Sequence, residues 1–302
     1  MPENFNQETS QAGSYLESGT IIDRYMIERE LAHGGFSSVY LARQTDDQIQ
    51  VAIKEYLPRR LAHRTENNMV VANNEAAQGL FRQGRSLFFE EAKVLATLKH
   101  PNIVQVISFF EANATVYMVM TYDYGLGLEK AIRKKTFEIT EEFFLELFSS
   151  LLYGIAHIHN HNFVHLDIKP GNILVRPGNN ALLLDFGAIQ KFPDSHLSKL
   201  SKVLTKGFSP IEQYDVMARL GPWTDIYAVG ATMRFCLDSK IPQSSPERLK
   251  KDELIPAVKA FKRKLPEYLL QAIDWAMCIQ PKDRPQSIAE FQQALIAPKD
   301  LN

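Results

Sequence analysis

The chain has 302 residues, of which 45% are hydrophobic and 23% charged, and its formal net charge is −1. This length suits two ordinary domains or one two-lobed enzyme, and the apolar content excludes an intrinsically disordered chain. The near-zero net charge gives no indication of nucleic acid or an acidic membrane surface as the main partner. Only two cysteines occur, Cys236 and Cys278, which argues against a disulfide framework and favours a reducing, cytoplasmic location.

The N-terminal 23 residues are polar and rich in Ser, Thr, Asn, Gln and Gly, which predicts a flexible leader. They lack the basic start and apolar run of a secretory signal. The sequence contains no run of about 18 or more uncharged apolar residues, so no membrane span is expected. The leader offers hydroxyl groups that are weak candidates for autophosphorylation, at Thr9, Ser10, Ser14 and Thr20.

A strand-rich part follows the leader. Tyr25–Glu30 and Val39–Ala42 are predicted to be strands around a glycine turn, and Gln50–Lys54 a third strand. The polar stretch 58–84 is interpreted as a long connection of the kind that is usually functional or mobile. Residues 85–99 have apolar side chains at helical spacing, which predicts an amphipathic helix.

Two more apolar strands complete this part, around 104–109 and 116–120. After Gly125 the pattern changes to long helices, such as Glu141–His159, with only short strands between them. The sequence therefore predicts an α+β chain with two lobes that meet near Thr121–Gly125. The expected parts are a leader (1–23), a sheet lobe with one long helix (24–122, with an insertion at about 55–84), a mostly helical lobe (123–295) and a tail (296–302).

Two features of the first lobe could serve phosphate binding. Glycines at Gly34 and Gly35, between two strands, let backbone N–H groups approach phosphate oxygens, although a plain hairpin turn would look the same. Lys54 ends the third strand, and a buried ammonium without a partner costs several kcal/mol. Glu91 on the following helix is the candidate partner, and a solvated surface lysine is the common alternative.

A second group of polar residues follows the lobe boundary. Asp167 stands two residues before Lys169 and five before Asn172, and Asp185 lies thirteen residues beyond Asn172. Hard oxygen ligands such as those of Asn172 and Asp185 suit Mg²⁺, which bridges phosphate groups. Each residue alone would be an ordinary polar loop residue, but their order and spacing indicate phosphate chemistry.

Taken together, these segments resemble the eukaryotic-type protein kinase family, and more narrowly its bacterial serine/threonine members, over residues 24–295. The match rests on eight segments in the family's order. They are His33-Gly34-Gly35-Phe36-Ser37-Ser38-Val39, Lys54, Glu91, His165-Leu166-Asp167-Ile168-Lys169-Pro170-Gly171-Asn172, Asp185-Phe186-Gly187, Glu212, Asp225 and Arg284. The resemblance implies a two-lobed kinase fold with ATP and Mg²⁺ as cofactors, where Mn²⁺ could replace Mg²⁺, and protein substrates.

The resemblance also implies roles for individual residues. Lys54, oriented by Glu91, would hold the α- and β-phosphates, and Asn172 and Asp185 would hold the metal. Asp167 would orient or accept the proton of the attacking hydroxyl, with Lys169 at the γ-phosphate. Thr205 would tie the substrate-binding loop to Asp167. The nucleotide is expected to contact Ala32, His33, Gly34, Gly35, Phe36, Ser37, Val39, Ala52, Met120, Thr121, Asp123 and Leu174.

The sequence departs from the family pattern in three places. The first and third glycines of the family's turn fall on Ala32 and Ser37, which predicts a weaker hold on the nucleotide. Leu166 replaces the arginine that often docks a phosphate on the activation segment, so activity should not depend on phosphates at Ser195, Ser198, Ser201 or Thr205. The segment 55–84 resembles an insertion in a branch of bacterial kinases whose third strand reads Ala-Ile-Lys-Glu-Tyr-Leu-Pro.

Several other interpretations compete with this one. Four histidines at 157, 159, 161 and 165 could suggest a metal site, but no cysteine or carboxylate stands at ligand spacing. A dinucleotide-binding fold would need a helix after the glycine turn, where a strand is expected. A pseudokinase that binds ATP as a scaffold and a small-molecule kinase on the same fold stay open, as does the oligomeric state.

Overall fold

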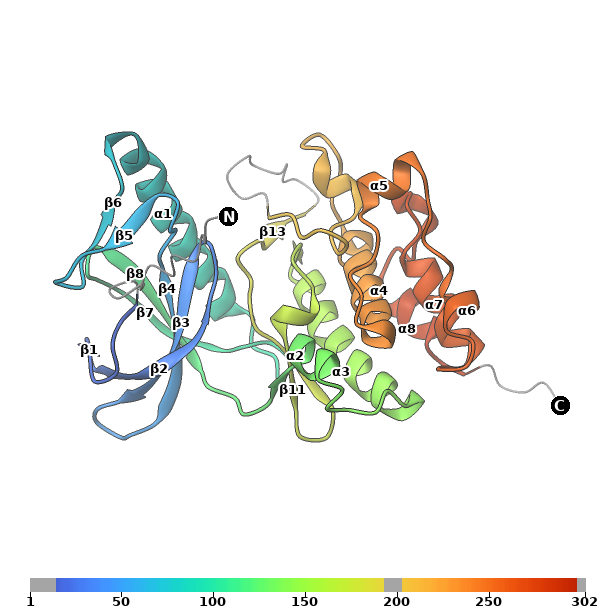
Figure 1. Cartoon of the computed structure of the whole chain (residues 1–302), viewed down its shortest axis with the longest axis horizontal. Coiled ribbons are helices and arrows are strands. Elements are labelled where there is room, and N and C mark those ends of the chain that lie inside the picture. Colours follow the sequence, from blue (N-terminus) through green and yellow to red (C-terminus); the bar gives the residue numbers. More distant parts are fainter. Residues whose placement is uncertain (1–14, 193–202, 298–302) are drawn as a thin grey trace, which may run out of the picture. The chain divides into compact units, whose positions relative to one another are not determined.

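The computed structural model describes residues 15–192 and 203–297, and the chain divides into two compact units (Figure 1). The first unit contains residues up to Ala96 together with Gln105–Tyr122, and the second contains Thr97–Val104 and the residues from Asp123 onward. The first is built on a sheet and the second is mostly helical. The α+β fold class predicted from the sequence is therefore confirmed.

The first unit is an antiparallel sheet with the strand order β1-β2-β3-β4-β8-β7. Side chains alternate between the two faces of each strand, and one face buries Tyr25, Ile27, Tyr40 and Ile53 in a common core. The strands are β1 (Ile21–Ile22), β2 (Tyr25–His33), β3 (Ser37–Gln44), β4 (Gln50–Tyr56), β7 (Val106–Ala112) and β8 (Thr115–Thr121).

The last residues of the expected leader belong to this unit rather than to a flexible tail. Leu16 is 4% exposed in the core of the sheet, and the Gly19 amide donates to the Ile27 carbonyl at 2.8 Å. The expectation of a flexible leader is thus wrong for residues 15–23, because the buried Leu16 and Ile22 outweigh a polar composition. Residues 1–14, with Thr9, Ser10 and Ser14, lie outside the described part of the chain.

The expected long connection at 58–84 is also different in the structure. It forms a short hairpin, β5 (Ala62–Arg64) with β6 (Val70–Ala72), and then the first turns of α1 (Glu75–Thr97). The helix begins ten residues before the predicted start. Gly79 and Gly84 lie inside it, and glycines in a sequence usually indicate a loop and not a helix interior. A glycine costs about 1 kcal/mol in a helix interior, but the buried Phe81 and Phe88 pack this face of α1.

The second unit is organised around two buried helices, α3 (Glu141–Asn160) and α4 (Pro222–Asp238). Thr140 caps α3 by accepting from the Phe143 amide at 3.1 Å. The smaller elements are β9 (Leu126–Gly127), α2 (Leu128–Arg133), β10 (Phe163–Val164), β11 (Ile173–Arg176), β12 (Asn180–Leu183), β13 (Gln190–Lys191), α5 (Ser245–Lys250), α6 (Ala257–Ala260), α7 (Glu267–Ala276) and α8 (Ile288–Ala294), with single 3₁₀ turns at Pro170–Asn172, Ile211–Tyr214 and Pro281–Asp283.

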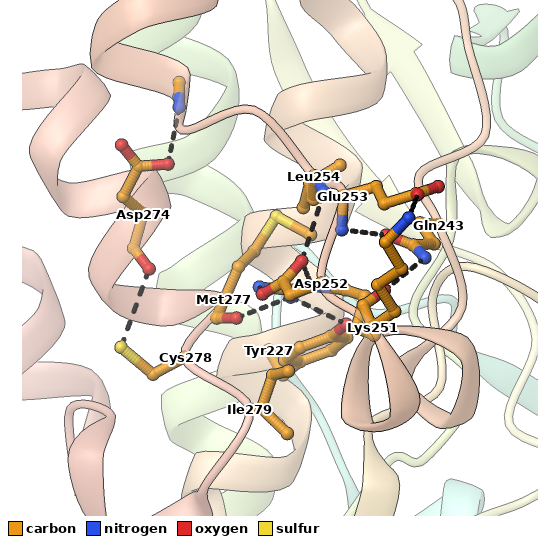
Figure 2. Close-up of polar contacts among 12 residues, drawn as sticks. Tyr227, Gln243, Lys251, Asp252, Glu253, Leu254, Asp274, Met277, Cys278 and Ile279 are labelled. Carbon is orange, nitrogen blue, oxygen red and sulfur yellow. Dashed lines mark hydrogen bonds and ion pairs between the residues drawn. The ribbon is translucent and has the colours of Figure 1, made fainter.

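Side-chain caps fix the link between α5 and α6 (Figure 2). Asp252 accepts from the Leu254 amide at 3.1 Å, and Gln243 accepts from the Glu253 amide at 2.9 Å. Asp274 of α7 accepts from the amides that begin α6, and its own carbonyl lies 3.7 Å from the Cys278 sulfur. Cys278 and Cys236 are both free thiols, and burial raises the pKa of each.

Within the described ranges, 15–192 and 203–297, no helix is both long enough and apolar enough to span a membrane.

Candidate active site

Lys54 and Glu91 form an ion pair inside the first unit. Lys54 lies on β4 and Glu91 on α1, and the ammonium is 3.0 Å from the carboxylate Oε1. The two side chains are only 9% and 11% exposed, so this is a largely buried pair and not a solvated surface lysine. The Phe88 ring lies 5.4 Å from the same ammonium. The structure thus brings together two residues that the sequence places 37 positions apart.

The Lys54→Met substitution should abolish measurable phosphate transfer while the chain stays folded. Methionine fills a similar volume but removes the charge that would meet the nucleotide phosphates. The measurement is incorporation of labelled phosphate from ATP, with thermal unfolding as the check on folding. Lys93→Met is the control. Lys93 lies on α1, the helix that carries Glu91, and pairs with Glu90 at 2.8 Å at an exposed position. Equal activity in the Lys54 and Lys93 variants would contradict the role of Lys54.

The glycine turn, residues 33–37, joins β2 to β3. The Gly34 amide donates to the Ser37 carbonyl at 2.9 Å, and Ala32 pairs with Val39 across the two strands. A Cβ at Gly35 would meet nothing within 4 Å, and Phe36 is 69% exposed. The space around Gly35 is therefore open, as the close approach of a phosphate to the backbone requires.

The residues expected around the adenine ring belong to both units. In the first unit, Val39 pairs with Lys54, and Ala52 pairs with Met120 one residue before Thr121. In the second unit, Asp123 forms an ion pair of 3.4 Å with Arg176. Leu174 of β11 packs tightly against Gly125, where a Cβ would lie 2.8 Å from the leucine Cγ.

Asp167 is the centre of a polar cluster in the second unit. Its Oδ1 accepts from the Thr205 hydroxyl at 2.7 Å, and its Oδ2 accepts from the Lys169 ammonium at 2.7 Å and the Asn172 amide at 3.0 Å. Lys169 also donates to the Thr205 hydroxyl at 3.3 Å. Three residues that the sequence singled out thus donate to the carboxylate of Asp167, a residue that is only 8% exposed.

The loop that carries Asp167 is fixed by Asp225 at the start of α4. The fully buried Asp225 carboxylate accepts from the amides of His165 and Leu166, both at 2.8 Å, and from His159 at 2.8 Å. Burial alone would raise the pKa of Asp225, but these donors lower it below its ordinary value. The anchoring holds Leu166 in the left-handed region, at a φ of 67°, which costs a non-glycine residue about 1–2 kcal/mol.

Leu166 itself points into an apolar cluster. It is 2% exposed and packs with Val164, Ala188 and Leu220, against which Val203 is also packed. Gln213 donates to the Leu166 carbonyl at 2.8 Å. A leucine here needs no anion to neutralise it, in contrast to a buried arginine. Ser195, Ser198 and Ser201 lie outside the described residues.

Asn172 and Asp185 flank the hairpin of β11 and β12. The Leu184 amide donates to the Asn172 carbonyl at 2.9 Å. Asp185 is the next residue after Leu184, so its backbone lies near Asn172. Because the Asn172 side-chain nitrogen donates to Asp167, its side-chain oxygen is the atom that suits a cation. An amide oxygen and a carboxylate fit Mg²⁺, which usually takes few protein ligands and completes its shell with water and phosphate.

Glu212 and Arg284 form a buried ion pair. Two guanidinium nitrogens donate to the two carboxylate oxygens at 2.7 and 3.1 Å, and the side chains are 0% and 3% exposed for Arg284 and Glu212 respectively. The remaining donors bind the carbonyls of Cys278, Trp223 and Ile279. The pair ties the 3₁₀ turn Ile211–Tyr214 to the segment between α7 and α8.

Among the described residues, no group of three or more His, Cys, Asp or Glu side chains is arranged to hold a metal ion, and the histidines make other contacts. His159 donates to Asp225, and His157 lies 4.4 Å from the ring of His161 and 5.1 Å from that of His100. The sequence did not predict that His159 and Gln213 support the loop of residues 165–172 through Asp225 and the Leu166 carbonyl. His159 was noted only as one of four histidines of a possible metal site, and Gln213 lies 41 residues beyond Asn172 in the sequence.

Comparisons with known proteins identify the family of the chain. The protein kinase domain family matches residues 25–296, and the chain belongs to this family. A solved structure described as "PpkA-294 apo form" has a TM-score of 0.84 and 31% identity, and the match covers 94% of this chain and 100% of that one.

Curated relatives are bacterial serine/threonine-protein kinases. Kinase D of Synechocystis sp. is 29% identical over 91% of this chain and 52% of the relative, and kinase B of the same organism is 32% identical over 54% and 30%. PknD of Chlamydia trachomatis serovar D is 26% identical over 91% of this chain and 31% of its own. The chain therefore spans about half or less of the length of these relatives.

Proposed function

We propose that this chain is an ATP-dependent protein serine/threonine kinase that transfers the γ-phosphate of ATP to hydroxyl groups of protein substrates. The observation that carries the proposal is the buried Asp167 carboxylate, contacted by Lys169, Asn172 and Thr205 within 3.0 Å. Such a carboxylate can orient a serine or threonine hydroxyl and take its proton. Family membership and the names of the relatives support the same reaction.

Other residues of the candidate site would neutralise the negative charge of the ATP phosphates. Lys54, oriented by Glu91, would bind the α- and β-phosphates, and Lys169 would lie at the phosphate being transferred. Asn172 and Asp185 would hold Mg²⁺, with Mn²⁺ as a substitute, and the metal would neutralise charge on the phosphates. The open backbone of the glycine turn would cover the phosphates, while Val39, Ala52, Met120, Thr121, Asp123 and Leu174 would contact the adenine end.

An assay of the purified chain with ATP and Mg²⁺ tests the proposal. The expected result is phosphate incorporation into the chain itself and into a general protein substrate such as casein, with the Asp167→Asn variant as the blank. ATP binding without transfer would identify a pseudokinase. Transfer to small hydroxyl compounds but to no protein would identify a small-molecule kinase instead.

We also propose that activity does not depend on phosphorylation of the activation segment. Leu166 packs in an apolar cluster where an arginine would require an anionic partner. Treatment with a phosphatase, confirmed complete by mass spectrometry, should leave the initial rate on an exogenous substrate within about twofold of the untreated rate, because no charge-assisted contact is removed. Loss of activity on dephosphorylation, with recovery after incubation with ATP, would contradict this.

A further inference from the structure

The insertion that follows β4 is attached to the glycine turn. We call residues 57–74 the brace: they run from the end of β4 through the hairpin of β5 and β6 to the start of α1 (Figure 1). The Leu57 amide donates to the Phe36 carbonyl at 2.9 Å, and the Arg59 amide donates to the Gly35 carbonyl at 3.1 Å. Two carbonyls of the turn are therefore held by the brace.

A third contact reaches the same turn through side chains. The Arg59 guanidinium lies 4.6 Å from the ring centre of Tyr15, and that ring lies 5.4 Å from the ring of His33. His33 immediately precedes Gly34. Tyr15 thus lies between the brace and the first residue of the glycine turn.

The brace is anchored to the sheet by a buried charge. Glu55 is fully buried and accepts from the hydroxyls of Tyr40 at 3.0 Å and Tyr117 at 2.6 Å, and from the guanidinium of Arg64 on β5. Arg64 also donates to the Asn68 carbonyl at 2.9 Å. Burial alone would lower the pKa of Arg64, but the Glu55 carboxylate raises it above its ordinary value. Arg64 therefore keeps its charge, and removing either partner would leave the other buried without its hydrogen-bond partner.

The position of this charge connects it with the candidate active site. Glu55 directly follows Lys54 on β4, so the two side chains point to opposite faces of the strand. The ion pair between Arg64 and Glu55 holds β5 against the sheet. Residues 57–59, which lie between the two partners in the sequence, are thereby kept beside the glycine turn. The Val70 amide adds a second anchor by donating to the Asn113 carbonyl at 2.8 Å.

We propose that Arg64 is a positioning residue for ATP, because its ion pair with Glu55 holds the brace and the brace holds the glycine turn in its binding conformation. This inference rests on the proposed function. It also accounts for Ala32 and Ser37, where the family's turn has glycines. A turn supported through the carbonyls of Gly35 and Phe36 needs less conformational freedom of its own.

The test compares Arg64→Met with Arg64→Lys and with the matched control Arg85→Met. Arg85 is in the same unit and forms a partly exposed pair with Glu111 at 3.2 Å. Equilibrium titration with a fluorescent ATP analogue gives the nucleotide Kd, and steady-state kinetics give KM and kcat separately. Hydrogen exchange reports on the Leu57 and Arg59 amides, and thermal unfolding shows whether each variant is folded.

In folded Arg64→Met, the Kd and the KM for ATP should rise by about tenfold to a hundredfold, the scale of a misplaced binding group, while kcat changes little. The Leu57 and Arg59 amides should exchange faster. Arg64→Lys should recover part of the affinity, and Arg85→Met should match the wild type. Unchanged affinity, unchanged exchange at these amides, or a fall in kcat alone would overturn the proposal.

Arg64→Met leaves Glu55 buried without its partner, so the variant could fail to fold. The double variant Glu55→Gln/Arg64→Met removes both charges and should show the same loss of affinity. Failure of all these variants to fold would make Arg64 purely structural and would overturn the proposal. Because the Kd is measured without phosphate transfer, a wild-type chain that binds ATP but transfers none would refute the proposed function and leave this inference testable.

Discussion

Asp167→Asn should lower kcat for phosphate transfer on the order of 10²–10⁴-fold, the typical contribution of a general base. Asparagine has nearly the same shape but cannot take a proton. It also cannot accept at both terminal atoms, where Thr205, Lys169 and Asn172 now donate. The fold should survive, since Asp225 holds the backbone of the loop independently.

Initial rates at saturating ATP, together with the Kd of a fluorescent ATP analogue, test this prediction. Nucleotide binding should stay close to that of the wild type, because Asp167 is not expected to contact the bound nucleotide before transfer. Asp215→Asn is the matched control, since Asp215 is an exposed carboxylate that accepts from the Met217 amide at 2.9 Å. A wild-type rate in Asp167→Asn would remove the basis for the proposed function.

Arg284→Met should have the largest effect on stability, a loss of about 3–5 kcal/mol in the free energy of unfolding. The substitution leaves the Glu212 carboxylate buried without its counter-charge and leaves the carbonyls of Cys278 and Ile279 without a donor. Native proteins are typically stable by only about 5–15 kcal/mol. The variant should therefore be only marginally folded at physiological temperature.

Urea unfolding followed by tryptophan fluorescence measures this loss. Lys251→Met serves as the control, because Lys251 and Glu253 form a pair of 2.6 Å whose side chains are 81% and 62% exposed. Exposed pairs contribute about 0–1 kcal/mol. The double variant Glu212→Gln/Arg284→Met should be more stable than additive effects predict, since neither charge is then left alone. An Arg284→Met loss no larger than that of the control would show that the pair is not what fixes this region.

The candidate catalytic residues of the loop 165–172 could be predicted from the sequence because they lie close together in it. Asp167, Lys169 and Asn172 lie within six consecutive residues, and the structure gathers them at one carboxylate. Glu91 was identified through its place on the helix that follows Lys54 and through its match to the family's helix glutamate. For such residues, spacing and residue type were enough to predict which side chains would contact one another.

The structure of the brace could not be predicted from the sequence in the same way. Nothing in the sequence distinguishes Glu55 and Arg64 from solvated surface charges, since their burial arises from packing against Tyr40 and Tyr117. The glycines inside α1 led to a predicted start that was too late, and two buried residues, Leu16 and Ile22, fix a segment of polar composition. In each case tertiary packing outweighed local propensity, which a single sequence does not reveal.

The two glycines of α1 differ in whether a larger residue could replace them in related sequences. A Cβ at Gly84 would lie 1.8 Å from the hydroxyl oxygen of Tyr56, whose ring stacks on Phe81 at 5.8 Å and contacts Phe88 at 5.7 Å. A Cβ at Gly79 would meet nothing within 4 Å. Other chains that share this attachment of α1 to β4 should therefore keep the tyrosine and the glycine as a correlated pair, while the position of Gly79 varies freely.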